Sequence, residues 1–265
     1  MMELKTYIKA NWLTKNPQRD GLVPTLVLMS LLIFTSFIYI NNIFSASLWM
    51  SASGELVFQK HEWWRAWTTL FAHGDLSHIF GNLFLFFPFS YYLISYFGYT
   101  FFSLVGFFSG GLVNLIVLQT MPASVGLIGA SGVVNWMGGA WLVLSWLIDR
   151  RESTGRRILK VVAVTIVLFV PDNFSPEVSY LSHFLGYFVG IFSAVIFYFL
   201  FKKKFDSEEI LETIPEDDNF VWGKDLEFYP EEQYYIDQLK ERLCQKELRE
   251  DNLSKGQSTL SSQCR

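Results

Sequence analysis

The chain has 265 residues, of which 51% are hydrophobic, 18% aromatic and only 17% charged, and its formal net charge is −4. Soluble domains carry about 25% charged residues, so this composition argues against an ordinary soluble domain. Four stretches contain no Asp, Glu, Lys or Arg at all: 21–54, 76–148, 161–171 and 178–201. Because roughly 20 apolar helical residues cross a bilayer core, the sequence predicts an all-α membrane protein that crosses the membrane several times.

Hydropathy, together with polar and glycine breaks, predicts six transmembrane helices. They span residues 22–44, 76–96, 99–119, 130–148, 157–171 and 181–201. The fifth is the weakest, because its uncharged core is short and ends at Pro171. Segment 45–75 is too polar to cross a membrane but rich in tryptophan, which predicts an interfacial loop after the first helix.

The pattern divides the chain into three parts: an N-terminal segment over 1–21, the helical core over 22–201, and a hydrophilic acidic tail over 202–265. Charge pairs at helical spacing over 230–251 predict a solvated helix followed by a disordered end, with a regulatory or partner-binding role as the alternative. The two cysteines, Cys244 and Cys264, both lie in this tail, so no disulfide framework is expected.

Lysine and arginine indicate the orientation of the helices. They gather in the N-terminal segment, in the loop after the fourth helix and directly after the sixth helix. The opposite loops hold only Lys60 and Arg65. By the positive-inside rule, both termini are expected to be cytoplasmic.

In this orientation the second, fourth and sixth helices begin at one level, near the outer surface. Their N-terminal ends carry His78 and Asn82, Ser131, and His183, respectively. His78 and Asn82 are four residues apart and therefore share a helix face. Polar residues within membrane spans usually face the bundle interior and indicate function, so their common depth predicts a shared site.

Small residues predict how two of these helices meet. On the sixth helix His183, Gly186 and Gly190 lie at positions i, i+3 and i+7, so the glycines form a small packing face beside the histidine. GASG at 129–132 supplies small residues on the fourth helix. If the two faces meet, the His183 imidazole comes within hydrogen-bond reach of Ser131, and a base beside a serine is what nucleophilic catalysis requires.

Each feature alone has a structural explanation. A glycine–serine segment usually serves packing, and an intramembrane histidine often makes only a structural hydrogen bond. His73 and Asp75 are expected to tie down the loop and to cap the second helix, and His61 is expected to be exposed. Only the combination points to catalysis.

Four segments resemble the rhomboid family of intramembrane serine proteases. They are Trp64–Arg65, HGDLSHIFGN at 73–82, GASG at 129–132 and HFLGYFVG at 183–190. They match the family's tryptophan–arginine loop, its histidine and asparagine on the second core helix, its G-x-S-G and its H-x-x-G-x-x-x-G. The order and the helix count match as well, so the resemblance covers about residues 20–201 and implies a six-transmembrane-helix rhomboid-like bundle.

The resemblance implies a role for each matched residue. Ser131 would be the nucleophile and His183 the general base, without a third acidic residue. His78, Asn82 and the backbone N–H of Ser131 would form the oxyanion hole. The structural motif residues would be Trp64, Arg65, Gly129, Gly132, Gly186 and Gly190. No cofactor or metal is implied.

The family's substrates are membrane proteins, single-pass or multi-pass, whose transmembrane helices have small or helix-breaking residues near the outer boundary. No nucleic-acid partner is implied, and the oligomeric state stays open. One position departs from the family. Many members have an aromatic residue one turn after the serine, which packs on the catalytic imidazole, whereas this chain has Asn135. Another group must then orient His183, for example through a hydrogen bond.

Two other functions compete with the protease. A catalytically inactive rhomboid-like protein would bind transmembrane helices without cutting them, but such relatives typically lack the serine or the histidine. A transporter or channel would place its polar residues near the middle of the membrane and not at one end of the helices. The bare six-helix core is similar to prokaryotic members, so a bacterial inner membrane is the expected location.

Overall fold

The computed structural model describes residues 4–17, 19–170 and 178–215. The chain divides into two compact units, and the residues described below belong almost entirely to the unit Thr6–Thr213. Pro171, the predicted tail helix at 230–251, Cys244 and Cys264 lie outside the described residues.

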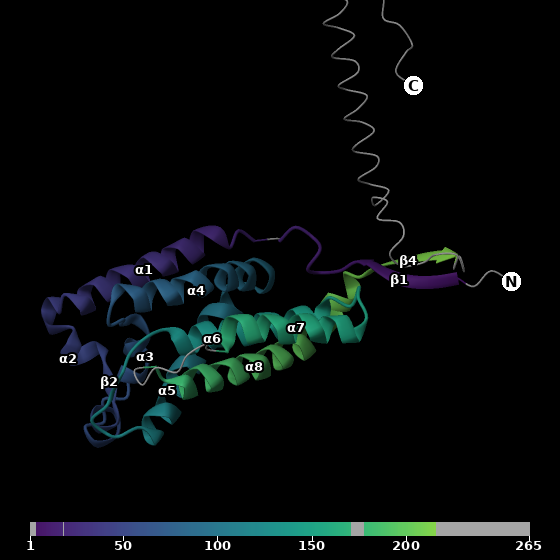
Figure 1. Ribbon diagram of the computed structural model, residues 1–265. Helices are drawn as coiled ribbons and strands as arrows, with labels where there is room; N and C mark the ends of the chain where they lie inside the picture. Colours follow the sequence, from purple (N-terminus) through teal and green to yellow (C-terminus); the bar gives the residue numbers. More distant parts are fainter. Residues whose placement is uncertain (1–3, 18, 171–177, 216–265) are drawn as a thin grey trace, which may run out of the picture. The chain divides into compact units, whose positions relative to one another are not determined.

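The described residues contain five helices that are long and apolar enough to cross a membrane (Figure 1). The chain is therefore an integral membrane protein with several spans, as predicted. The candidate spans are α1 (Leu22–Ile40), α4 (Leu76–Phe97), the continuous stretch of η4 (Thr100–Val105) and α5 (Gly106–Thr120), α6 (Ser131–Ile148) and α8 (Tyr180–Ser207).

The fifth predicted span corresponds to α7 (Thr154–Phe169), which has 16 residues. At 1.5 Å per residue it is about 24 Å long, less than a hydrocarbon core of about 30 Å. The six-span count therefore stays a prediction. None of the residues of α7 is buried, and it contacts α8 through the Thr165 Oγ1 and Tyr187 hydroxyl oxygens, 2.6 Å apart.

Short elements, and no long helix, fill the segment between α1 and α4. In chain order they are η1 (Ile43–Ser45), α2 (Ser47–Met50), β2 (Ala52–Ser53), η2 (Glu55–Gln59), α3 (Arg65–Thr68) and η3 (Thr69–Phe71). Strand β2 pairs antiparallel with β3 (Gly126–Leu127), with Ala52 opposite Leu127. This pairing links the segment directly to the residues that precede α6.

A second two-stranded sheet joins β1 (Leu4–Ala10) to β4 (Ile210–Pro215). Nearby, Arg150 forms an ion pair with Asp206, 3.0 Å apart. The guanidinium of Arg157 donates to the carbonyl oxygens of Trp146 and Asp149, at the C-terminal end of α6. A cation is favourable at the negative end of a helix dipole, so Arg157 stabilises this end of α6.

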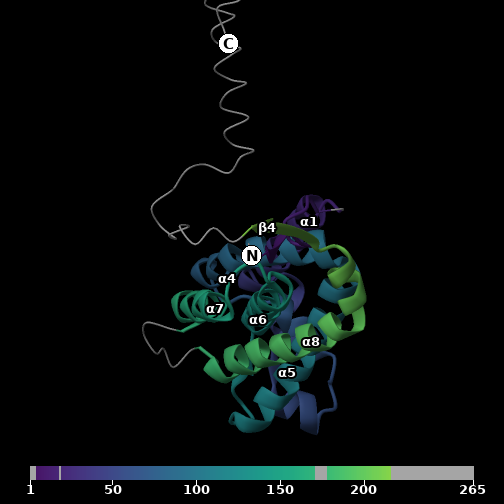
Figure 2. The ribbon, with the colours of Figure 1, turned by 90° about the vertical axis from the view of Figure 1, so that its right-hand side faces the viewer.

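Helix α6 lies at the centre of the bundle, with α4, α7 and α8 around it (Figure 2). Of its span 61% is buried, compared with 22% for α8 and 17% for α1. Trp136, Met137, Ala140 and Leu144 are completely buried, and they belong to the main hydrophobic cluster. The environment of α6 is therefore set by protein on nearly all sides.

Helices α6 and α8 approach each other so closely that glycine is required on both. A Cβ on Gly186 would overlap the carbonyl oxygen of Gly132, and one on Gly190 would overlap the carbonyl oxygen of Trp136. In the other direction, a Cβ on Gly139 would overlap the carbonyl oxygen of Tyr187. Such backbone contact is typical of small-residue packing between transmembrane helices.

We expect Gly186→Ala to destabilise the protein by about 1–3 kcal/mol, because the new methyl group would push the backbones of α6 and α8 apart. The measurement is the melting temperature in one detergent. The control is Gly81→Ala in α4, where a Cβ meets nothing within 4 Å. There alanine should be neutral, or stabilise by about 0.5–1 kcal/mol, because glycine is a poor helix former. Equal melting temperatures for both variants would contradict the close packing.

Candidate active site

The first turn of α6 is the centre of the candidate site. Helix α6 begins at Ser131, its N-cap residue is Ala130, and no side chain caps it. The first backbone N–H groups of a helix have no partner within the helix and form the positive end of its dipole. Ser131 is half-buried. The serine therefore lies where an anion would be stabilised.

His183 lies in the first turn of α8, half-buried, and its backbone N–H donates to the Ser179 carbonyl at 3.3 Å. The preceding residue, Ser182, is buried, and its Oγ would lie 2.7 Å from a Cβ on Gly132. The turn of α8 that carries His183 therefore packs against the residue that follows Ser131. Among the described residues, no hydrogen bond joins the side chains of Ser131 and His183. Catalytic hydrogen bonds are often long in enzymes without substrate.

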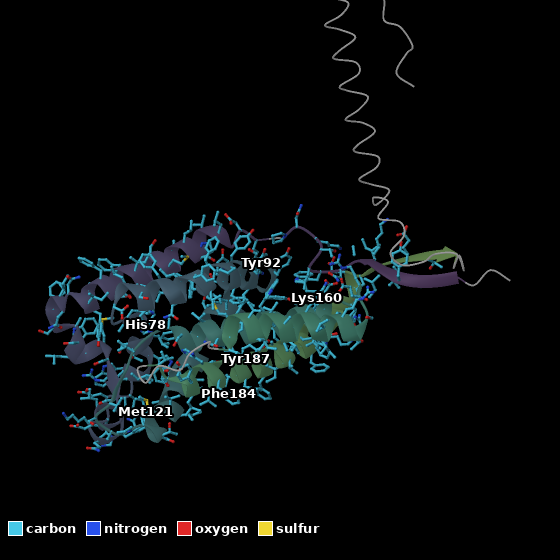
Figure 3. All side chains as sticks on the ribbon, in the orientation of Figure 1. His78, Tyr92, Met121, Lys160, Phe184 and Tyr187 are labelled. Atoms are coloured by element: carbon cyan, nitrogen blue, oxygen red, sulfur yellow. The ribbon has the colours of Figure 1, made fainter. Side chains whose placement is uncertain are left out.

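His78 packs against the residues just before the serine. Gly129 has a φ of 113°, which favours glycine, and a Cβ there would lie 2.7 Å from Nε2 of His78. Figure 3 shows His78 toward one end of the bundle and Lys160 toward the other. The imidazole of His78 also lies edge-on to that of His73, with the ring centroids 5.0 Å apart. The structure thus brings parts of α4 and α8 against the start of α6.

Asn82 follows one turn after His78 on α4 and is 7% exposed. Its side-chain nitrogen Nδ2 is buried and has no hydrogen-bond partner among the described residues. Buried donors are almost always paired in folded proteins, and each exception calls for an explanation. Asn82 thus offers a preorganised N–H donor that no other described residue uses.

His73 holds the chain that leads into Ser131. It is completely buried, and its Nε2 accepts the backbone N–H of Ala130 at 3.3 Å. Since Nε2 is the acceptor, Nδ1 carries the proton and donates to the Ser36 hydroxyl of α1 at 2.8 Å. The sequence indicates that His73 ties down the loop, but it does not reveal the partners, which lie 37 and 57 residues away.

Burial lowers the pKa of His73 to about 4, from the ordinary 6.5. The neighbouring imidazole of His78 lowers this pKa further, whereas Asp75 opposes the change. Asp75 is the N-cap residue of α4, and its carboxylate accepts the backbone N–H of His78 at 2.8 Å, so the predicted cap is confirmed. At neutral pH, His73 is therefore uncharged and remains an acceptor for Ala130.

Thr69 adds two more hydrogen bonds to the same segment, and nothing in the sequence pattern identifies it. Its hydroxyl donates to the Leu127 carbonyl, and its own carbonyl accepts the backbone N–H of Gly129 at 3.0 Å. Thr69 is fully buried. Together with the pairing of β2 and β3, these bonds fix the backbone of the three residues before Ala130.

Arg65 joins the short elements between α1 and α4. It is 5% exposed, and its guanidinium donates to the carbonyl oxygens of Leu48 and Ser51, at 2.6 and 3.0 Å. It also forms an ion pair with Glu62. Trp64, by contrast, leaves 55% of its surface exposed. Arg65 therefore makes the internal contacts of this segment, and Trp64 presents its ring outward.

Asn135 has a partner other than His183. Its Nδ2 donates to the carbonyl oxygen of Ser131 at 2.9 Å, one turn back on the same helix. Among the described residues, no hydrogen bond is made by the imidazole of His183. A ring contact with Tyr180 is present instead, with the ring centroids 6.1 Å apart.

We expect the stability of the protein to fall as the pH is lowered from 6.5 toward 4. The unfolded chain binds a proton on His73 near pH 6.5, whereas the folded protein resists it until about pH 4. A lowered pKa of this size corresponds to about 3 kcal/mol, lost across that window. In His73→Gln this proton is missing, so the melting temperature should depend less steeply on pH. Parallel curves for the two proteins would contradict this role of His73.

Comparison with known proteins agrees with this architecture. A family model described as the Rhomboid domain matches residues 60–199, which is more than half of the chain. A search of curated proteins found no match. The matched range contains α4, α5, α6 and α7, the candidate site residues and most of α8. The chain belongs to the rhomboid family.

Proposed function

We propose that the protein is an intramembrane serine endopeptidase that hydrolyses peptide bonds in or near transmembrane helices of membrane-protein substrates. Ser131 would be the nucleophile and His183 the general base. The observation that carries the proposal is the backbone contact between Gly132, which follows Ser131 directly, and Gly186, which lies one turn after His183. Two helices locked at this point would bring the serine and the histidine together, which is the arrangement that nucleophilic catalysis needs.

In the proposed reaction, Oγ of Ser131 attacks the substrate carbonyl carbon while His183 takes the hydroxyl proton. The tetrahedral intermediate then collapses, the peptide C–N bond breaks, and His183 gives the proton to the leaving amine. Water hydrolyses the acyl-enzyme by the same steps, with His183 again as the base. Both proton transfers involve one imidazole, so no third acidic residue is required.

The negative oxygen of the intermediate would be stabilised by donors around the first turn of α6. Asn82 contributes a buried N–H that has no partner among the described residues, and His78 lies against Gly129. The backbone N–H of Ser131 and the positive end of the helix dipole add to them. Preorganised donors of this kind usually make the largest single contribution to such catalysis.

The main alternative is a catalytically inactive rhomboid-like protein that binds transmembrane helices without cutting them. Retention of both Ser131 and His183 favours the enzyme. The Asn82 side-chain nitrogen, which has no partner among the described residues, favours the enzyme as well, because a protein that only binds helices has no use for an oxyanion donor. Labelling with a serine-directed fluorophosphonate separates the two functions.

The distribution of lysine and arginine supports an orientation with both termini cytoplasmic. The similarity of the helical core to prokaryotic members supports a location in a bacterial inner membrane. The candidate site would then lie near the outer surface. Hydrolysis needs water, and a site at the ends of the helices is accessible to water without a path across the bilayer. Single-pass or multi-pass membrane proteins would be the substrates.

We expect Ser131→Ala and His183→Ala each to abolish cleavage of a transmembrane test substrate and labelling by fluorophosphonate. The double variant should be little worse than either single variant, because residues that act as one unit are not additive. The control is Ser193→Ala on α8, whose hydroxyl accepts from the Trp136 indole at 3.3 Å and which lies almost three turns past His183. It should keep its activity. Full activity of Ser131→Ala would end the serine-protease proposal.

We expect Asn82→Ala to lower kcat on folded enzyme, because removal of one oxyanion donor costs on the order of 10²–10³ in such sites. The other donors remain, so the loss should be smaller than for Ser131→Ala. Melting temperature and single-turnover cleavage are measured side by side. Since Nδ2 of Asn82 has no partner among the described residues, its removal breaks no hydrogen bond with them.

The matched control for that experiment is Asn114→Ala on α5. Asn114 is equally buried, but its Nδ2 donates to the Ala66 carbonyl at 2.9 Å. It should therefore lose stability and keep its kcat, the reverse of Asn82→Ala. If well-folded Asn82→Ala cleaves at the normal rate, Asn82 has a structural role only.

A further inference from the structure

We infer that Tyr180 is the positioning residue of His183: its ring holds the imidazole in the direction of Ser131. The inference rests on the proposed function and adds to it a residue that the sequence pattern does not single out. Tyr180 is the first residue of α8 and lies three positions before His183, so the two side chains share a helix face.

The geometry of the two rings is that of an edge-to-face pair. Their centroids are 6.1 Å apart, and their planes make an angle of 79°. Aromatic pairs favour this arrangement at centroid distances of about 4.5–7 Å, where it contributes about 0.5–1.5 kcal/mol beyond the burial of area. A contact of this kind selects one orientation of the imidazole from those that its two side-chain torsions allow.

Two polar side chains of the candidate site are engaged elsewhere. Asn135, one turn after Ser131, donates its amide to the Ser131 carbonyl. His78 has its Nε2 against Gly129. In the described part of the chain, Tyr180 is the one aromatic ring that contacts the His183 imidazole. The aromatic ring beside His183 therefore comes from Tyr180 on the same helix, α8. The corresponding family position on α6 is Asn135, which has no ring.

A helix neighbour provides a matched control. Phe184 follows His183 directly, is 60% exposed, and contacts Phe188 at a centroid distance of 4.5 Å (Figure 3 shows Phe184 on α8). Its ring makes no contact with His183 among the described residues. Replacement of either aromatic by leucine removes a ring from the same part of α8, but only Tyr180→Leu removes the contact with the imidazole.

The experiment compares Tyr180→Leu, Tyr180→Ala, Tyr180→Phe and Phe184→Leu with the unchanged protein. For each one, kcat and KM for a transmembrane test substrate, the rate of fluorophosphonate labelling and the melting temperature are measured in the same detergent. Rates refer to folded protein. The fluorophosphonate is small and does not dock as a helix, so its labelling rate reports on Ser131 and His183 apart from substrate binding.

Tyr180→Leu and Tyr180→Ala should lower kcat and the labelling rate roughly three- to tenfold, with KM unchanged. Tyr180→Phe keeps the ring and should stay within about twofold of the unchanged protein, and so should Phe184→Leu. The inference is overturned if Tyr180→Leu reacts as fast as Phe184→Leu. It is also overturned if Tyr180→Phe is as slow as Tyr180→Leu, because the hydroxyl and not the ring would then be responsible.

Ser131→Ala and His183→Ala are run alongside. Activity in those two would refute the proposed function itself, whereas inactive dyad variants beside a normal Tyr180→Leu would refute only the role of Tyr180.

Discussion

The backbone contact between α6 and α8 is the constraint on which the candidate site depends. Glycines on both helices allow carbonyl oxygens to occupy the space that a Cβ would need, at Gly139, Gly186 and Gly190. In a bilayer the hydrophobic effect does not drive helices together, so close van der Waals packing must do so. Because the contact lies next to Ser131 and His183, the packing that holds the bundle together also fixes the geometry of the site.

A second layer of hydrogen bonds holds the chain on the N-terminal side of Ser131. His73 and Thr69 bind backbone groups of Leu127, Gly129 and Ala130 just before α6, and His73 also reaches Ser36 on α1. All three of these side chains are buried. The segment around Ser131 is therefore held from both directions, by helix packing after it and by buried hydrogen bonds before it. In contrast, the His183 imidazole has a single ring contact among the described residues, with Tyr180.

The sequence predicts the spans and the gathering of polar residues because both depend on local patterns. Glycine spacing on α8 indicates a packing face, and that face meets the start of α6. The end of α8 is harder to predict. The lysines from residue 202 suggest a stop at 201, yet the helix continues to Ser207, with Lys202 paired to Asp206 four residues on. Charge ends a span but does not end a helix.

Other features depend on partners far along the chain, which no local pattern reveals. Examples are the bond from His73 to Ala130, the pairing of β2 with β3, and the absence of a partner for Nδ2 of Asn82 among the described residues. The ring contact of Tyr180 depends on side-chain torsions at the first turn of a helix, so the sequence leaves its existence open. The segment between α1 and α4 is likewise predicted as one loop, but its six short elements are not.

The pairing of β1 with β4 has a consequence for biosynthesis. Thr6 and Thr213 are joined across 207 positions of sequence, so the first strand of the chain waits for almost the last described residues before it has a partner. At ribosomal rates of about 5–20 residues per second, that interval is roughly 10–40 s. During this time β1 exposes an unpaired edge, which is a template for wrong association. Strand β4 directly follows α8 in the sequence. β1 therefore obtains its partner strand just after the helix that carries His183 has been synthesised.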